Sequence, residues 1–402
     1  MRVVFLSPTY PPEMRQFTRG LAEVGAEVLG VGDGTPDAEL RRYLTDYLQV
    51  PSILDEEEVI ARVHGWLRGR TVDRVLANWE PLVIVAARLR ERFGLPGMSV
   101  DTVRGFRDKQ LMKERVAAAG LRVPHSRRVR SVKDAWAAVE HTGYPAIIKP
   151  ISGAGSADTY KVESAAELER VLPLLRHVAE ASCEEFIDGE EYTYDTVCVD
   201  GAPLYESVTR YLPNALEMRS IEWVSPIMLS VRDLSQPHVT GGIELGRKVL
   251  TALGMGDGMT HMEWFRKRDG EVVFGEIACR PGGACIVDQI NYTSDIDLFR
   301  EWARVATLRR FEASTERKYN VAVVFKRAQG DGRITNIVGL RDYMARHGQH
   351  VVEETLLRPG TPRRDWKNTL LSDGYLVVRH PDWERALELA FAAATDIKLY
   401  AS

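Results

Sequence analysis

Two acidic residues, Glu263 and Glu276, stand at equal spacing on either side of the dipeptide Asp269-Gly270. An Asp-Gly pair between apolar-rich runs is a strong signal for a β-hairpin. If it forms the centre of the turn, the two acids face each other with Cβ atoms about 4.5–5.5 Å apart, where like charges destabilise a sheet. A cation between them would remove that penalty, and Mg²⁺ prefers such oxygen ligands. A solvent-facing hairpin with exposed acids is the alternative.

The predicted hairpin brings further groups to the same face. Side chains on one face of a strand recur at every second residue. We therefore expect the acids to share their face with His261, Phe265, Phe274 and Ala278. Arg280 follows just beyond, and then the small residues Gly282 and Gly283. An arginine beside two metal-binding acids indicates phosphate chemistry.

Two lysines upstream could meet a phosphate. Lys149 ends the apolar run Ala146-Ile147-Ile148 and adjoins a loop of small residues whose N–H groups could converge on an anion. The loop is not a Walker A motif, because the Gly-Lys-Ser/Thr ending is absent. Lys109 lies in the first turn of a predicted helix, where a cation opposes the helix dipole. A lysine covering apolar surface at a strand end and a solvated surface lysine are the alternatives.

An acidic stretch from Cys183 to Asp195 reads as strand, short turn and strand. Glu191 could accept hydrogen bonds from both ribose hydroxyls, and the extended backbone at residues 185–187 could read an adenine edge. A charged surface hairpin is the alternative. The apolar Phe186 and Ile187 within the acidic cluster argue modestly against it.

Alternating strands and helices must position these groups. The first hundred residues predict an open α/β unit, and residues 101–183 predict a small α+β subdomain with the glycine-rich loop. Residues 184–310 predict a larger α+β subdomain with the metal site, and residues 311–402 a separate α+β lobe or cap. The segment Gly30-Val-Gly-Asp-Gly34 lacks the final spacing of a dinucleotide fingerprint and predicts only a glycine-rich turn.

Composition excludes several classes of protein. The 402 residues exceed a single core, so two or three packed domains are expected. A net charge of −4 gives no electrostatic reason to expect nucleic acid or an anionic membrane as a partner. The sequence shows neither a signal peptide nor an apolar run long enough to span a bilayer, which predicts a cytoplasmic protein. Its four cysteines form no Cys-x-x-Cys pair and are expected to be reduced thiols.

Taken in order, these pieces resemble the ATP-grasp superfamily, specifically its carboxylate-amine ligases of the L-amino-acid ligase type. The resemblance spans roughly residues 100–300, and no single motif would be specific alone. The matching segments are Arg107-Asp108-Lys109, Ile147-Ile148-Lys149-Pro150 with the glycine loop, Glu184-Glu185-Phe186-Ile187-Asp188-Gly189-Glu190-Glu191, His261-Met262-Glu263, and Glu276-Ile277-Ala278-Cys279-Arg280-Pro281-Gly282-Gly283.

The resemblance implies a role for each position. ATP would be bound by Lys109, Lys149, Gly153, Gly155, Ser156, Glu184, Glu185, Phe186, Ile187 and Glu191. Glu263 and Glu276 would hold Mg²⁺ or Mn²⁺ at the β- and γ-phosphates, and Arg280 would be catalytic, neutralising the transferring phosphoryl group. The substrate candidates are Arg210, His261, Gly282 and Gly283. Residues 205–226 are candidates for substrate contacts or a lid, with an exposed connection as the alternative.

Two positions depart from the family pattern. Ala278 stands where the family often has a metal-binding asparagine, so water must replace that ligand. Asp158 stands where the loop commonly has glycine. Aspartate tolerates the left-handed backbone better than most residues, but its charge would repel a triphosphate unless it points away.

The expected activity is an ATP-dependent ligase that joins a carboxylate, that of an amino acid, to an amine, giving a dipeptide-like product. An acyl phosphate would form first, and ADP and phosphate would be released. One alternative is a purine-biosynthesis-like ligase or carboxylase, for which Arg15, Arg19 and Arg104 could supply an extra phosphate site. Another is a nucleotide-binding protein without catalysis. Small-molecule substrates are the expected partners, and a homodimer is common among such ligases.

Overall fold

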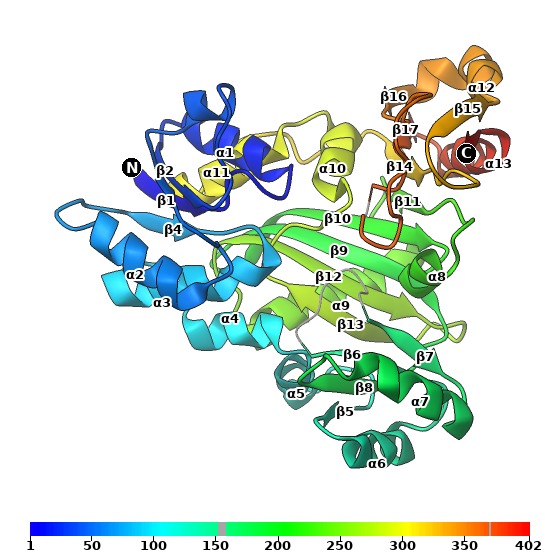
Figure 1. The fold of residues 1–402 in the computed structure, drawn as a ribbon, viewed down its shortest axis with the longest axis horizontal. Coiled ribbons are helices and arrows are strands. Elements are labelled where there is room, and N and C mark those ends of the chain that lie inside the picture. Colours follow the sequence, from blue (N-terminus) through cyan, green and yellow to red (C-terminus); the bar gives the residue numbers. More distant parts are fainter. Residues whose placement is uncertain (152–157, 370) are drawn as a thin grey trace.

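We analysed a computed structural model of the chain, which describes residues 1–151, 158–369 and 371–402. Three larger sheets and one two-stranded sheet organise it (Figure 1). The predicted nucleotide-binding residues Gly153, Gly155 and Ser156 lie outside the described residues. The described part of the chain contains no helix with the length and apolar character needed to cross a membrane.

The N-terminal domain is an open α/β unit, as the alternating pattern predicts. Its sheet has the order β3-β2-β1-β4, and its strands run parallel. The strands are β1 (Arg2–Leu6), β2 (Glu27–Gly32), β3 (Asp46–Gln49) and β4 (Arg74–Leu76). The helices are α1 (Met14–Glu23), α2 (Glu56–Trp66) and α3 (Val83–Phe93), with the short 3₁₀ turns η1 (Leu40–Tyr43) and η2 (Glu80–Leu82). Buried apolar strands with helices on both sides are typical of such sheets.

Two consecutive helices, α4 (Val100–Arg107) and α5 (Lys109–Ala118), connect this domain to the next. The sequence predicted a helix with Lys109 in its first turn. Asp108 ends α4 and caps α5, because its carboxylate accepts hydrogen bonds at 3.0 Å from the N–H groups of Gln110 and Leu111. This cap makes Lys109 the first residue of α5.

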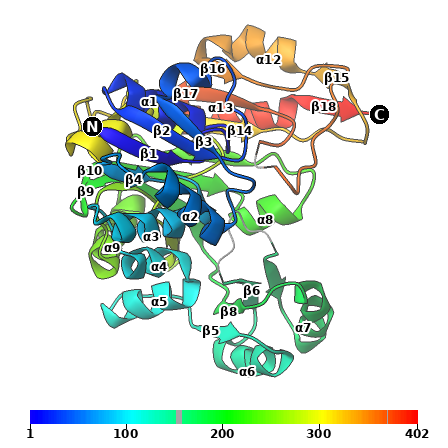
Figure 2. The same ribbon diagram turned by 60° about the vertical axis from the view of Figure 1, so that its left-hand side comes forward.

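The small subdomain is a four-stranded antiparallel sheet of order β5-β8-β6-β7 with helices on one side (Figure 2). Its strands are β5 (Ser126–Val129), β6 (Ala146–Pro150), β7 (Tyr160–Val162) and β8 (Ala181–Glu185). Its helices are α6 (Val132–Thr142), α7 (Ala165–Val171) and the 3₁₀ turn η3 (Leu172–Leu175). Lys149 of β6 and Glu184 of β8 are therefore carried on adjacent strands.

The central sheet has eight strands in the order β13-β12-β9-β10-β11-β14-β17-β16. They are β9 (Glu190–Val199), β10 (Ala202–Leu212), β11 (Ile227–Ser230), β12 (Gly258–Arg266), β13 (Val272–Ala278), β14 (Asn320–Phe325), β16 (Val351–Glu354) and β17 (Tyr375–His380). Its accompanying helices are α8 (Ala215–Ser220), α9 (Pro237–Leu253), α10 (Ile286–Ser294) and α11 (Leu298–Leu308). Helix α9 lies close to one face because Gly242 and Gly246 leave room for Trp264 and Tyr194; a Cβ at either glycine would stand within 2.3 Å of those rings.

Strands β14, β16 and β17 of the C-terminal segment belong to the central sheet. Strand β14 pairs with β11, and β17 and β16 continue the central sheet from there. The central sheet thus contains strands from both sides of the predicted boundary at residue 311. The rest of the segment comprises α12 (Leu340–His347), the 3₁₀ turn η4 (Gly348–His350), α13 (Trp383–Asp396), and the two-stranded sheet of β15 (Ile334–Val338) with β18 (Lys398–Ala401).

The hairpin of β12 and β13 places Glu263 opposite Glu276, as predicted, but by a different route. Its turn is longer than the predicted two residues: the Lys267 N–H donates to Glu271 O, and Gly270 is left-handed at φ +89°. The longer turn shifts the pairing register of the two strands by one residue, and a bulge at Gly275 shifts the register back. Phe274 consequently points into the core beneath α9, and its predicted place on the acidic face is wrong.

Candidate active site

A cavity of about 570 Å³ lies between the small subdomain and the central sheet. The small subdomain contributes β6 and β8, and the central sheet contributes β9, β12 and β13, while α8 closes one side (Figure 2). The sequence-predicted residues that line this cleft are Lys109, Lys149, Glu184, Glu185, Phe186, Ile187, Glu191, Glu263 and Glu276. Residues far apart in the sequence therefore meet in one cleft of a size suited to a small ligand.

A chain of alternating charges runs along the floor of the cleft. Lys113 Nζ lies 2.8 Å from Glu184 Oε1, and Lys149 Nζ lies 3.1 Å from Glu184 Oε2. Glu276 Oε2 lies 3.2 Å from Lys149 Nζ and 3.0 Å from Lys109 Nζ. Burial would raise the pKa of Glu184, but Lys113 and Lys149 outweigh it and lower that pKa to about 2. The carboxylates of Glu184 and Glu276 are therefore ionised at neutral pH.

The opposed acids are thus stabilised by cations of the protein itself. Burial would raise the pKa of Glu276, but Lys109 and Lys149 hold it well below its usual range. Glu263 has His261 as a neighbour, with 3.8 Å between Oε1 and Nε2. Burial would lower the pKa of His261, but Asp195 at 2.7 Å and Glu263 raise it to about 9. The facing carboxylates alone therefore do not require a metal ion in this structure.

A divalent metal ion nevertheless fits the donor set. Glu263 and Glu276 face each other across the ladder and both line the cleft. Ala278 pairs with His261 farther along and supplies no ligand atom. Among the described residues no cluster of three or more His, Cys, Asp or Glu could hold a metal by itself. Two carboxylates completed by water and phosphate oxygens are a common arrangement for Mg²⁺.

Glu191 lies at the edge of the cleft beneath α8. It is buried, and its Oε2 accepts a 2.6 Å hydrogen bond from the Ala215 N–H at the start of α8. Burial together with the charge of Glu263 raises the pKa of Glu191 to about 8. Asn214 caps the same helix, and residues 214–217 line the cleft. The segment 205–226 is thus partly a wall of the cleft and not merely an exposed connection.

The segment expected to contact adenine uses some of its backbone groups within the protein. The N–H of Glu185 donates to His125 O at 2.8 Å, and the N–H of Phe186 donates to Pro145 O at 3.1 Å. The N–H of Ile187 has no hydrogen-bond partner among the described residues. The Glu185 carboxylate pairs with Arg122 at 2.8 Å. Only part of the predicted backbone edge is therefore open to a ligand.

Arg280 lies beyond the end of β13 in a buried arginine–glutamate–arginine group. Its Nε donates to Glu80 Oε2 at 2.6 Å, while Arg107 Nη1 donates to Glu80 Oε1 at 2.7 Å. Burial would raise the pKa of Glu80, but the two arginines lower it. Burial would lower the pKa of Arg280, but Glu80 raises it. Glu80 is thus a permanent anion that positions Arg280 at the junction of the N-terminal domain and the central sheet.

The predicted substrate residues are placed differently from one another. Gly282 packs against His261, since a Cβ there would lie 2.9 Å from His261 Nδ1, and Gly283 begins the turn that follows. Arg210 instead pairs with Glu190 at 2.6 Å and lines a separate groove, so the structure does not bring it to the cleft. The next residue, Tyr211, points to the opposite face of the strand from Arg210. Its hydroxyl interacts electrostatically with Glu263 and Arg280.

The structure shows where the side chain of Asp158 points, which matters because Asp158 is one of the two departures from the family pattern. Its backbone is left-handed, with φ at +51°, as expected for a residue in a glycine position. Its carboxylate lies 2.9 Å from Nε2 of the exposed His177. The side chain does not line the cleft. Asp158 therefore points away from the place where phosphates would lie.

Sequence reasoning missed several groups of the site. Lys113 lies one helical turn after Lys109, a spacing that could have indicated a shared face. Glu80, Tyr211 and Glu13 come from distant parts of the sequence, and no local signal pairs them with Arg280. Asp288 in turn lies close to Glu13. Burial and the nearby acids raise the pKa of Asp288 to about 7. These contacts depend on how the domains pack.

Comparison with known proteins defines the class. Residues 142–288 match the family model described as the ATP-grasp domain. The fold matches the crystal structure of an L-amino acid ligase from Bacillus licheniformis with a TM-score of 0.80, at 18% identity, covering 100% of this chain and 99% of that one. It also matches N5-carboxyaminoimidazole ribonucleotide synthetase from Thermotoga maritima, with a TM-score of 0.73, 19% identity, and coverage of 100% and 99%. The chain contains an ATP-grasp domain and has the ATP-grasp fold.

Sequence relatives narrow the comparison further. The L-arginine-specific L-amino acid ligase of Bacillus subtilis is 29% identical over 245 residues, which are 59% of this chain and 58% of the relative. The alanine–anticapsin ligase of Bacillus subtilis is 26% identical over 262 residues, 60% and 56% of the two chains. This chain thus spans little more than half the length of the curated relatives it matches.

Proposed function

We propose that the protein is an ATP-dependent ligase that joins the carboxylate of an amino acid to an amine and releases ADP and phosphate. One observation carries this proposal: Lys109, Lys149 and Glu276 are in contact on the floor of the cleft, with Glu263 opposite. Arg280 stands beyond the same strand. The relatives named as amino-acid ligases support the same activity.

In this proposal the cleft binds ATP with its base near residues 185–187 and its ribose near Glu191. Lys109 and Lys149 exchange Glu276 for phosphate oxygens, and Glu263 and Glu276 would hold Mg²⁺ or Mn²⁺. The metal supplies positive charge at the phosphates. Lysine contacts are suited to such a site because phosphoryl transfer depends mainly on positioning and charge neutralisation. Lys113 stays paired with Glu184 throughout.

The reaction proceeds in two steps. An oxygen of the substrate carboxylate bonds to the γ-phosphorus while the bond to the β–γ bridging oxygen breaks, which gives an acyl phosphate and ADP. The amine nitrogen then attacks the acyl carbon, phosphate leaves, and the nitrogen loses a proton. Arg280, held by Glu80 at 2.6 Å, orients the anionic groups in both steps. Binding within the cleft keeps water from the acyl phosphate.

The proposal is tested by incubating the protein with ATP, Mg²⁺ and pairs of amino acids while ADP, phosphate and the amide product are measured. Release of AMP and pyrophosphate would reject the acyl-phosphate route. Glu276→Gln should reduce turnover at least a hundredfold, as expected for loss of a phosphate-site charge. Glu271→Gln is the matched control, because Glu271 lies on the same hairpin and, among the described residues, forms ion pairs only with Lys267 and Arg122. Full activity of Glu276→Gln would remove the metal assignment.

A purine-biosynthesis-like ligase is the second candidate, and the related fold of the synthetase from Thermotoga maritima motivates it. Its substrate would need an extra basic phosphate site. Two of the arginines considered for that site are already neutralised: Arg15 pairs with Asp37 at 2.7 Å, and Arg19 with Asp297 at 2.9 Å. ADP release that responds to phosphoribosylamines and not to amino acids would favour this candidate. A cytoplasmic location and a homodimer stay predictions.

A further inference from the structure

Helix α8 forms a wall of the nucleotide cleft but has little hydrophobic attachment to the rest of the protein. Residues 214–217, at its beginning, line the cleft. Met218 is the only one of its six residues that is buried. A helix of this length is unstable by itself in water. The position of α8 is therefore set mainly by polar contacts at its two ends.

The contact at the beginning of α8 is with the nucleotide site. The N–H of Ala215 donates to Glu191 Oε2 at 2.6 Å. Glu191 is buried, and its carboxyl group has no other hydrogen-bond partner among the described residues. The orientation of the group that we assign to the ribose therefore depends on where α8 begins.

The contact at the end of α8 is with the C-terminal segment. Arg327 follows β14 and is only 8% exposed. Its Nη2 donates to Met218 O at 2.8 Å, and its Nη1 donates to Ile221 O at 2.8 Å. The last carbonyls of a helix have no partner within the helix. One buried arginine of the C-terminal segment thus satisfies the end of α8.

A loop of the C-terminal segment, residues 363–369, completes this attachment. The loop extends toward α8 (Figure 1). Arg219 of α8 donates to the backbone carbonyls of Trp366 and Lys367. No described residue after Glu276 lines the cleft, so this attachment lies outside the nucleotide site.

We propose that Arg219 and Arg327 are positioning residues, through which the C-terminal segment sets the affinity of the cleft for nucleotide. Neither side chain lines the cleft. They hold the end of α8, and the beginning of α8 holds the carboxyl group of Glu191 at the ribose. If α8 is displaced, the ribose hydroxyls lose this hydrogen-bond partner. The inference rests on the proposed function, which places the ribose at Glu191.

The test is calorimetric titration of the full chain, in the presence of Mg²⁺, with ADP and with dideoxy-ADP, which lacks both ribose hydroxyls. The wild type should bind ADP about tenfold more tightly than dideoxy-ADP, the effect of about one net hydrogen bond. Arg219→Met and Arg327→Met should each raise the Kd for ADP about tenfold and abolish this discrimination. Arg327→Lys keeps the charge and some of the donors, so it should recover part of the affinity.

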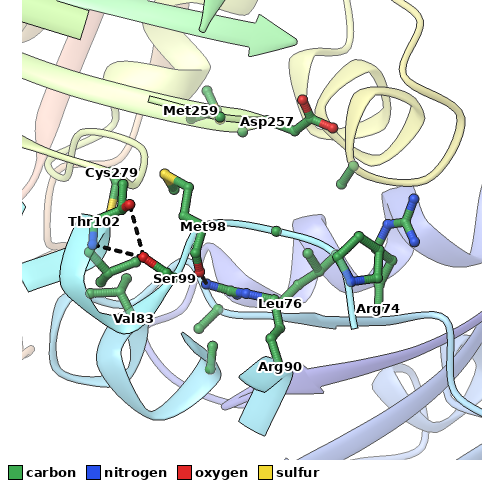
Figure 3. A pocket seen from close by; sticks show the side chains of 18 of the residues that line it. Arg74, Leu76, Val83, Arg90, Met98, Ser99, Thr102, Asp257, Met259 and Cys279 are labelled. Atoms are coloured by element: carbon green, nitrogen blue, oxygen red, sulfur yellow. Dashed lines mark hydrogen bonds between the residues drawn. The ribbon is translucent and has the colours of Figure 1, made fainter. Parts of the chain in front are cut away.

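Two control variants should bind ADP as the wild type does. Arg364→Met removes a cation from the same loop, because Arg364 donates to Ser372 O at 3.2 Å and, among the described residues, forms no hydrogen bond with α8. Val83→Ala controls for a general loss of stability. Val83 is buried in the wall of a separate cavity between the N-terminal domain and the central sheet, which shares no lining residue with the cleft (Figure 3).

The outcomes that contradict the inference are distinguishable. A wild type that does not bind ADP would overturn the proposed function and this inference with it. Equal binding of ADP and dideoxy-ADP by the wild type, or unchanged ADP binding by either methionine variant, would overturn this inference alone. Arg219 is half-buried, so Arg219→Met is expected to fold, and it decides the question even if Arg327→Met does not fold.

Discussion

Replacing Asp288 with asparagine should stabilise the protein at alkaline pH. Asp288 lies on α10, and burial together with the charges of Glu353 and Glu13 raises its pKa from 3.8 to about 7. A raised carboxyl pKa means that the folded state resists ionisation, so ionised Asp288 opposes folding. The opposition begins above the unfolded pKa near 4, grows as the pH rises, and levels off above about 7. Asparagine carries no charge, so the substitution removes this destabilising effect.

The expected gain in the free energy of unfolding follows from the size of the pKa shift. About three pKa units at about 1.4 kcal/mol each give an upper bound of about 4 kcal/mol at pH 8. The same linkage gives a little over a third of that value at pH 5, because the unfolded Asp288 is ionised there while the folded one is not. Since the side chain is only partly shielded from solvent, we expect about 2 kcal/mol at pH 8 and less than 1 kcal/mol at pH 5.

The assay is urea unfolding of Asp288→Asn and wild type at pH 5 and pH 8, followed by tryptophan fluorescence. Asp297→Asn is the control of opposite sign. Burial would raise the pKa of Asp297, but Arg19 lowers it, so this variant should lose stability at pH 8. Asn also retains the cap of α11. A gain for Asp288→Asn that is equal at the two pH values, or a loss at pH 8, would refute the linkage.

Three other variants probe the site. Lys113→Met should lower the free energy of unfolding by about 3 kcal/mol in urea and raise the KM for ATP, because Glu184 would then hold Lys149 alone; an unchanged KM would contradict the positioning role. Gly275→Ala should cost about 1–3 kcal/mol in thermal unfolding, since its Cβ would lie 2.8 Å from Glu263 O; wild-type stability would show that the bulge is dispensable. Glu80→Gln should reduce turnover about tenfold or more with an intact fold by circular dichroism, because Arg280 loses its carboxylate partner; normal turnover would exclude Glu80 from positioning Arg280.

The hairpin of β12 and β13 shows which features of the fold could be predicted from the sequence. The facing of Glu263 and Glu276 was predicted from a two-residue turn, yet the structure reaches it through a longer turn and a compensating bulge at Gly275. The two one-residue offsets cancel at the acids but not at Phe274, which is why that residue was placed on the wrong face. Alternation along a strand is a local signal, and a bulge interrupts it.

Other features could not be read from the sequence because they are set by packing between distant segments. The pairing of β14 with β11 joins residues about a hundred positions apart and makes the C-terminal segment part of the central sheet. Glu80 and Arg280 meet only when the N-terminal domain docks. The lysines and acids of the cleft were accessible because short motifs carry them, whereas the groups that hold those motifs in place are scattered.

The alternating charges on the floor of the cleft affect which ligands can bind there. Lys109 and Lys149 are already neutralised by carboxylates, so a free phosphate must break established ion pairs before it can bind. A bare cation meets the same obstacle at Glu276. A metal–nucleotide complex carries both partners at once, and the number of ion pairs is conserved as they exchange. Under the proposed function, this arrangement would favour the complex over either component by itself.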